Sequence, residues 1–96
     1  MEDLRAVSYG HAVSSLGYEV KMGKNDLIWK DGKHTVSWDM KKQKDGTYLI
    51  KRSSREIKYH QHEGEKDEVL GERELSIIDD IVSRAMKVLR VKASFA

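Results

Sequence analysis

The sequence contains no cysteine and no proline. Without cysteine there is no disulfide framework, no zinc site built on thiolates and no cysteine nucleophile, which fits a reducing compartment. No run of about 18 apolar residues exists, so no membrane-spanning helix is predicted. Residues 1–5 also lack the basic-then-apolar order of a signal peptide. We therefore expect a cytoplasmic protein that has no membrane partner.

What the sequence does contain is charge, spread unevenly along a single domain of 96 residues. The formal net charge is only +2. Residues 19–62 nevertheless hold eleven Lys or Arg against six Asp or Glu, whereas residues 63–96 hold six against eight. A basic segment of this kind can mark a surface for phosphates or for an acidic protein, but solvated strand edges are also commonly rich in lysine.

The strongest strand and turn signals lie in residues 26–50. Apolar and polar residues alternate in three segments, which predicts three antiparallel strands. They are residues 27–29, 34–40 and 47–50. Asp31-Gly32 predicts a two-residue type I′ hairpin between the first two strands. Asp45-Gly46 follows a polar lysine run, so we expect a longer loop between the second and the third.

Helical patterns lie on both sides of this segment. Residues 2–16 begin with two acids, end before Gly17 and carry an apolar stripe, which predicts an N-terminal helix. The stripe consists of Tyr9, Ala12, Val13 and Leu16. From about Glu72 to Lys92 apolar residues recur at helical spacing over roughly half the circumference, which predicts a long C-terminal helix.

The remaining segments complete the predicted fold. Residues 18–22 alternate as a first strand, and residues 55–62 are consistent with a fifth, edge strand. Residues 63–74 are rich in acids and predict a mobile linker. We thus expect an α+β domain, an antiparallel four- to five-stranded sheet with an N-terminal and a long C-terminal helix on one face (α-β-β-β-β-(β)-α).

Two strings in this order resemble a known family. Residues 16–20 read LGYEV after the first helix, and residues 45–50 read DGTYLI at the end of the sheet. Over roughly residues 12–52 the sequence resembles the Ycf35 family, small domains of unknown function. The resemblance implies a fold and no activity, so it assigns no functional residue and no cofactor.

Docking to a protein partner, or to a second copy as a homo-oligomer, is the function that the sequence favours. The apolar face of the C-terminal helix is wider than one side of a small sheet requires. The interaction residues would be Ile77, Ile81, Val88 and Val91. No nucleophile frame and no glycine-rich phosphate loop are present, so we expect a protein that is not an enzyme and carries no cofactor.

Binding of RNA or DNA through the basic sheet region is the alternative. The residues that would contact phosphate are Lys30, Lys33, Lys42, Lys51, Arg52 and Arg55. The element order is similar to that of double-stranded-RNA-binding domains, although the C-terminal helix begins with acids where those domains have lysine and arginine. Any of the aromatic residues Trp29, Trp38, Tyr48 and Tyr59 that faced outward would stack on bases. The two tryptophans fall on the alternating apolar face, however, so we expect them in the core.

A metal site is a weaker alternative. In an extended segment His60 and His62 project to one side, and imidazole suits zinc or iron-type ions. No third ligand has a fixed spacing from them, so the sequence equally predicts an exposed strand end without metal.

Overall fold

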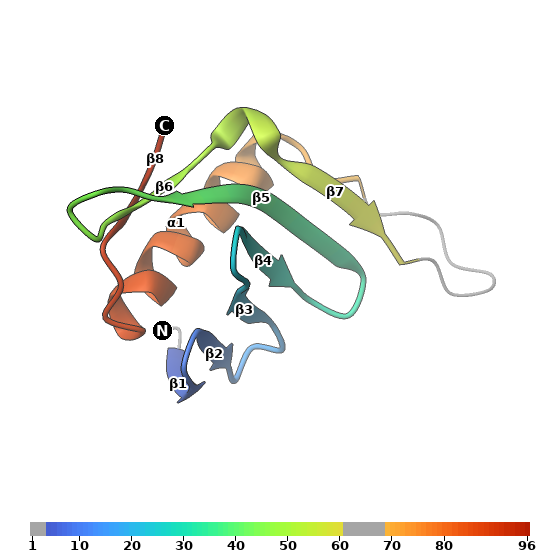
Figure 1. Cartoon of the computed structure of the whole chain (residues 1–96). Coiled ribbons are helices and arrows are strands. Elements are labelled where there is room, and N and C mark those ends of the chain that lie inside the picture. Colours follow the sequence, from blue (N-terminus) through green and yellow to red (C-terminus); the bar gives the residue numbers. More distant parts are fainter. Residues whose placement is uncertain (1–3, 61–68) are drawn as a thin grey trace.

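The computed structural model describes residues 4–60 and 69–96, which form eight strands, one α-helix and one short 3-10 helix (Figure 1). The strands are β1 (Leu4–Ser8), β2 (His11–Ser14), β3 (Glu19–Met22), β4 (Asp26–Lys30), β5 (His34–Lys42), β6 (Tyr48–Ile50), β7 (Glu56–Tyr59) and β8 (Ala93–Phe95). The helix α1 spans Glu72–Val88, and the 3-10 helix η1 spans Arg52–Ser54. Within these residues no helix is both long and apolar enough to cross a membrane.

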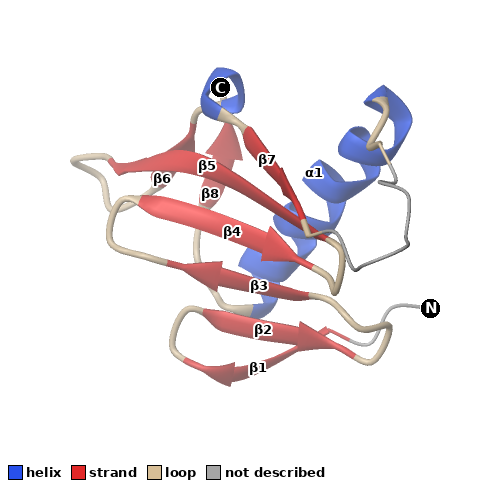
Figure 2. Cartoon of the chain, turned by 90° about the vertical axis from the view of Figure 1, so that its right-hand side faces the viewer, coloured by secondary structure: helices blue, strands red, loops and turns tan. Residues whose placement is uncertain are grey.

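The strands form one curled sheet in the order β1-β2-β3-β4-β5-β6-β8. The first six strands pair antiparallel with their neighbours, and β8 adds to β6 in parallel. Strand β7 pairs with residues 34–37 of β5, beside the stretch 40–42 that pairs with β6. Helix α1 lies against the concave side of this half-barrel (Figure 2).

The prediction of an N-terminal helix, and with it the predicted fold class, is wrong. Residues 4–14 form the β1–β2 hairpin, in which Leu4 pairs with Ser14. Gly10 adopts a φ of 70°, a left-handed conformation that closes the turn and breaks a right-handed helix. Ala12 and Ser14 are buried at a spacing of two, the period of a strand. The chain is therefore an eight-stranded mixed sheet with one helix, not a four- to five-stranded antiparallel sheet with two.

The C-terminal helix is present but ends at Val88, short of the predicted Lys92. Arg90 takes a φ of 59°, and its N–H donates to the Lys87 carbonyl while the Val91 N–H donates to the Met86 carbonyl at 2.9 Å. This pair of hydrogen bonds is a Schellman motif, which turns the chain away from the helix axis. The freed residues reach β6 and pair with it as β8.

The two Asp-Gly turns differ from each other. Gly32 has no positive φ, so the type I′ prediction is wrong. Instead, the Asp31 carboxylate accepts the N–H groups of Lys33 and His34 at 2.8 and 2.7 Å and closes a longer turn. The longer loop predicted at Asp45-Gly46 is confirmed, with Gly46 at a φ of 88°.

The core lies between the concave sheet face and α1. From the sheet it takes alternate residues of β3, β4, β5 and β6, including Trp29 and Trp38 as expected. From α1 it takes Leu75, Ile78, Ile81, Val82, Ala85 and Met86. Trp38 is 1% exposed and meets Phe95 edge-on at 5.9 Å between ring centroids. Each large side chain buried here stabilises the fold by about 1.5–3 kcal/mol, which makes this layer the main source of stability.

Candidate nucleic-acid interface

Two adjoining hollows lie where three turns and the end of α1 meet. The first, of about 530 Å³, is lined by Tyr9, Met22, residues 23–25, Lys42 and Tyr48. The second, of about 350 Å³, is lined by Tyr9, Lys42, residues 45–48 and residues 89–92. Because Tyr9, Lys42 and Tyr48 line both, the two hollows adjoin, and together we call them the tyrosine groove.

The turns position the two tyrosines of the groove. Tyr9 precedes Gly10 at the tip of the β1–β2 hairpin and is 91% exposed. The Gly10 carbonyl accepts the Met22 N–H at 2.7 Å, so this tip is held against the end of β3. Tyr48 lies opposite Lys42 in the β5–β6 ladder, and its N–H donates to the Lys92 carbonyl at 2.8 Å. Tyr9 thus presents an exposed ring, whereas Tyr48 is half-buried and lines the wall of the groove.

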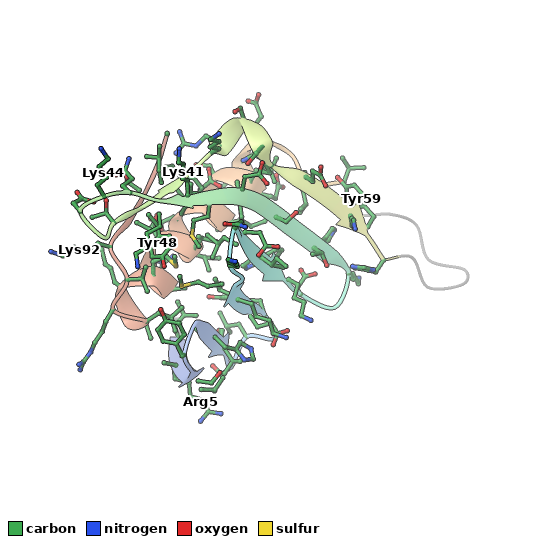
Figure 3. The ribbon with its side chains drawn as sticks, viewed as in Figure 1. Arg5, Lys41, Lys44, Tyr48, Tyr59 and Lys92 are labelled. Carbon is green, nitrogen blue, oxygen red and sulfur yellow. The ribbon has the colours of Figure 1, made fainter. Side chains whose placement is uncertain are left out.

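Four cations and one acid line the groove. The cations are Lys24, Lys42, Arg90 and Lys92, and the acid is Asp45. Within residues 4–60 and 69–96 none of the four cations has a carboxylate within 4 Å. Figure 3 shows Tyr48 and Lys92 on the same side of the molecule as Lys41 and Lys44, whereas Tyr59 lies on the opposite side. The groove is therefore a basic, aromatic surface.

Asp45 is already engaged by its own loop. The Thr47 hydroxyl and the Thr47 N–H donate to its carboxylate at 2.6 and 3.0 Å. These hydrogen bonds, with a smaller contribution from the charge of Lys92, lower the pKa of Asp45. The carboxylate is consequently ionised near neutral pH and serves to hold the β5–β6 loop in shape, leaving three net positive charges along the groove.

Lys30, predicted to contact phosphate, is neutralised in an ion pair. Its Nζ lies 2.9 Å from Glu19 Oε1, and His11 contacts the other oxygen of Glu19 at 3.0 Å. The hydrogen bond from Lys30, aided by His11 and by the charges of Lys30 and Lys21, lowers the pKa of Glu19 to about 2 against the effect of its burial. Lys30 is therefore part of a fixed cluster on the outer face of the sheet.

Arg52 and Arg55 likewise form ion pairs within the protein. They approach opposite oxygens of Asp79 on α1 at 3.4 and 3.6 Å, and Arg52 also lies 5.1 Å from the centre of the Phe95 ring. Burial raises the pKa of Asp79 despite the two guanidinium charges. These contacts join η1 and the residue after it to α1, so both arginines already have a carboxylate partner within the protein.

The other two predicted phosphate contacts also lie outside the groove. Lys33 is exposed in the β4–β5 turn, and Lys51 is exposed just before η1. Of the six cations predicted from the sequence, only Lys42 lines the groove.

The predicted interaction residues do not form one free face. Ile81 is 6% exposed and belongs to the core, and Val91 packs against it. Ile77 and Val88 are 50% and 38% exposed. The apolar side of α1 is thus largely covered by the sheet, and only two of the four residues offer accessible surface.

The weak metal candidates are not brought into a ligand set. The His60 ring contacts the Thr35 hydroxyl at 2.8 Å, whereas His62 lies outside the described residues. Across residues 4–60 and 69–96 no group of three or more potential ligands converges on one point.

Tyr9, Lys24, Arg90 and Lys92 were not predicted from the sequence as site residues. The sequence patterns place Tyr9 and Arg90 in helices, where their turn conformations are not expected. Gly10 was the signal that would have found the first, because a glycine inside a helical pattern weakens the prediction of a helix and is common in turns. Arg90 and Lys92 reach the groove only through the Schellman motif at the end of α1, for which the sequence offers no glycine.

Comparisons with protein-family models, with curated proteins and with solved structures find no match to this chain. The resemblance to the Ycf35 family therefore stays a prediction, which rests on the LGYEV string, the apolar strand near residues 26–28 and the DGTYLI string. Function is consequently inferred from the residues of the tyrosine groove.

Proposed function

We propose that this protein binds single-stranded nucleic acid in the tyrosine groove. The observation that carries the proposal is the placement of Tyr9 and Tyr48 among four cations that no carboxylate of the described chain pairs. Tyrosine rings stack on bases of any identity, and lysine and arginine between them neutralise the phosphates that link those bases. The same side of the protein thus offers both interactions that a single strand requires.

A single strand fits this arrangement better than a duplex. In a double helix both faces of each base are covered by neighbouring base pairs, so a tyrosine ring has no face on which to stack. Tyr9 is 91% exposed at the tip of a hairpin, where it meets a splayed base without any rearrangement of the protein. We expect duplex DNA of the same length to compete poorly.

The stacking half of the proposal is tested with Tyr9→Ala. Binding of a labelled mixed-sequence oligonucleotide of about 12 nucleotides is measured by fluorescence anisotropy. The loss of one stacked base should weaken binding by about 1–3 kcal/mol. Leu16→Ala is the matched control, because Leu16 is 66% exposed in the β2–β3 turn, outside the groove. Equal affinities for the two variants would overturn the proposal.

The electrostatic half is tested with salt. Four phosphate contacts predict that log K falls with log salt at a slope of about −2.8, since each contact on a single strand contributes about −0.7. Lys42→Gln should make this slope shallower by about 0.7. Lys58→Gln on β7, which is exposed and lies outside the groove, should leave it unchanged. Binding that does not respond to salt would contradict the role of the groove cations.

Docking to a protein partner or to a second copy stays a prediction. One of its four predicted contact residues, Ile81, is buried in the core and is not accessible to a partner. A non-enzymatic role and a cytoplasmic location also remain predictions from the composition.

A further inference from the structure

We infer that nucleic-acid binding in the tyrosine groove is coupled to the pairing of strand β8 with β6, and that Phe95 is the residue that positions Lys92 for this purpose. This inference rests on the proposed binding of single-stranded nucleic acid. Phe95 itself lies outside the groove, so it would act on the ligand only through Lys92.

The C-terminal segment of the chain connects the groove to the core. Lys92 lines the smaller hollow, and the three residues after it form β8 in parallel with β6 (Figure 1). The pairing starts at the groove wall, where the Tyr48 N–H donates to the Lys92 carbonyl at 2.8 Å. At the other end of β8 the Ala96 N–H donates to the Ile50 carbonyl at 2.9 Å. The backbone of Lys92 is therefore fixed by the same pairing that holds β8.

Phe95 is the side chain that anchors this short strand. A parallel pair is slightly less stable per residue than an antiparallel pair, and β8 has only three residues. The Phe95 ring meets the buried Trp38 edge-on at 5.9 Å between centroids, and the Arg52 guanidinium lies over the ring at 5.1 Å. Both contacts stabilise the ring beyond its burial alone. Removal of the ring is thus expected to release β8 from the sheet.

Arg90 does not depend on β8, although it lines the same hollow. Its N–H donates to the Lys87 carbonyl at 3.1 Å, and the Val91 N–H donates to the Met86 carbonyl, so α1 itself holds this turn. Release of β8 therefore withdraws Lys92 from the groove and leaves Arg90 in place. This difference separates an effect on one cation from a general loosening of the protein.

The size of the coupling follows from one phosphate contact. Each contact on a single strand contributes about 0.7 to the salt slope, so its loss weakens binding about 5-fold at about 0.1 M salt. Coupling between two events is reciprocal, so saturating nucleic acid should favour the paired state of β8 by the same factor. Amide exchange that proceeds through local opening of β8 should then slow by about 5-fold.

Phe95→Ala tests the first direction, with the labelled oligonucleotide and anisotropy at several salt concentrations. The slope should be shallower by about 0.7, as it should be for Lys92→Gln. The double variant Phe95→Ala/Lys92→Gln should match Lys92→Gln alone, whereas Phe95→Ala/Arg90→Gln should lose two contacts. Phe95→Leu keeps an apolar anchor and should restore most of the slope. Ile57→Ala on β7 is the matched control, because it also removes a half-buried side chain that packs on the core and should leave the slope unchanged.

Hydrogen exchange of the unaltered protein tests the reverse direction and does not require any variant to fold. The Ala96 amide, which donates to the Ile50 carbonyl, should exchange about 5-fold more slowly when the oligonucleotide is saturating. The His60 amide, which donates to the Lys33 carbonyl next to β7, is the control and should not change.

The outcomes separate the role of β8 from the function of the groove. A wild-type slope in Phe95→Ala, or an effect of Phe95→Ala that persists in the Lys92→Gln background, overturns the inference and leaves the proposed function intact. Exchange of the Ala96 amide that does not respond to the oligonucleotide does the same. Absence of binding by the unaltered protein at low salt overturns the proposed function itself, and the inference with it.

Discussion

Replacing Gly10 with alanine distinguishes the observed hairpin from the helix that the sequence suggests, because the two structures predict opposite signs. In the middle of a helix, alanine is more favourable than glycine by about 1 kcal/mol, so Gly10→Ala would stabilise the protein. In the hairpin Gly10 has a φ of 70°, where an L-residue is strained. The same substitution must then destabilise it.

The magnitude follows from two contributions. Forcing alanine into the left-handed region costs about 1–2 kcal/mol. A Cβ at this position would also lie 3.3 Å from Met22 Cβ, closer than an ordinary van der Waals contact. Reduced entropy of the unfolded chain offsets about 0.4–1 kcal/mol. The strain less this offset leaves about 0–1.6 kcal/mol. The contact with Met22 adds to it, so we expect a net loss of about 1–2 kcal/mol, which lowers Tm by about 4–16 °C for a domain of this size.

Two other glycines provide matched controls. Gly17 has a φ of 94°, but nothing lies within 4 Å of the position that an alanine Cβ would take, so Gly17→Ala reports the backbone strain alone. Gly32 has neither a positive φ nor a neighbour within 4 Å, so Gly32→Ala should be neutral or stabilise by up to about 1 kcal/mol. The excess loss in Gly10→Ala over Gly17→Ala measures the contact with Met22.

Urea denaturation followed by the fluorescence of the two buried tryptophans gives these free energies of unfolding. The order of stability should be Gly32→Ala, then wild type, then Gly17→Ala, then Gly10→Ala. A Gly10→Ala variant more stable than wild type would refute the hairpin and restore the helix.

Two further predictions concern turns. Arg90→Gly should raise the free energy of unfolding by about 1 kcal/mol, because glycine adopts the φ of 59° at the end of α1 without strain. The same substitution should weaken oligonucleotide binding, because it removes one cation of the groove. Equal stability of variant and wild type would contradict the strain. Burial favours a raised pKa for Asp31, but hydrogen bonds from Lys33 and His34 outweigh it and lower the pKa, so the carboxylate stabilises the fold above its unfolded pKa of about 3.9. Asp31→Asn should therefore cost about 1 kcal/mol at pH 7, and the difference in unfolding free energy should disappear as pH falls through the lowered folded pKa. A difference that persists in acid would show that charge is not its source.

The strands within residues 26–50 were predictable because their apolar residues fit a single periodicity, that of a β-strand. Residues 34–40 alternate between buried and less buried positions along β5, and no helical stripe competes with that pattern. Residues 9–16 satisfy both periods, since Ala12 fits the helical stripe and the strand alternation alike. The positive φ of Gly10 selects the hairpin over the helix, and the sequence alone does not reveal that φ. Strand β8 was not predictable, because its three residues pair in parallel with a distant strand.

The tyrosine groove was even less accessible from the sequence. Its residues come from the β1–β2, β3–β4 and β5–β6 connections and from the end of α1, so no local window contains more than a part of it. Several of the cations that charge density favours have carboxylate partners in the fold, as Glu19 pairs with Lys30 and Asp79 with Arg52, and the sequence does not show these pairs. A cation that has no carboxylate partner is available to bind a ligand. Only the tertiary structure shows which cations lack such a partner.

Left-handed backbone conformations concentrate around this groove. Of the four described residues with positive φ, Gly46 and Arg90 line it and Gly10 lies at its edge beside Tyr9. Glycine adopts such a conformation freely, but arginine does so at a cost of about 1 kcal/mol. A residue that keeps a strained conformation where glycine would be more stable is expected where its side chain has a function. Arg90 lines the tyrosine groove, and among the described residues no carboxylate lies within 4 Å of it, so its strained conformation and its charge support the proposed binding surface by independent arguments.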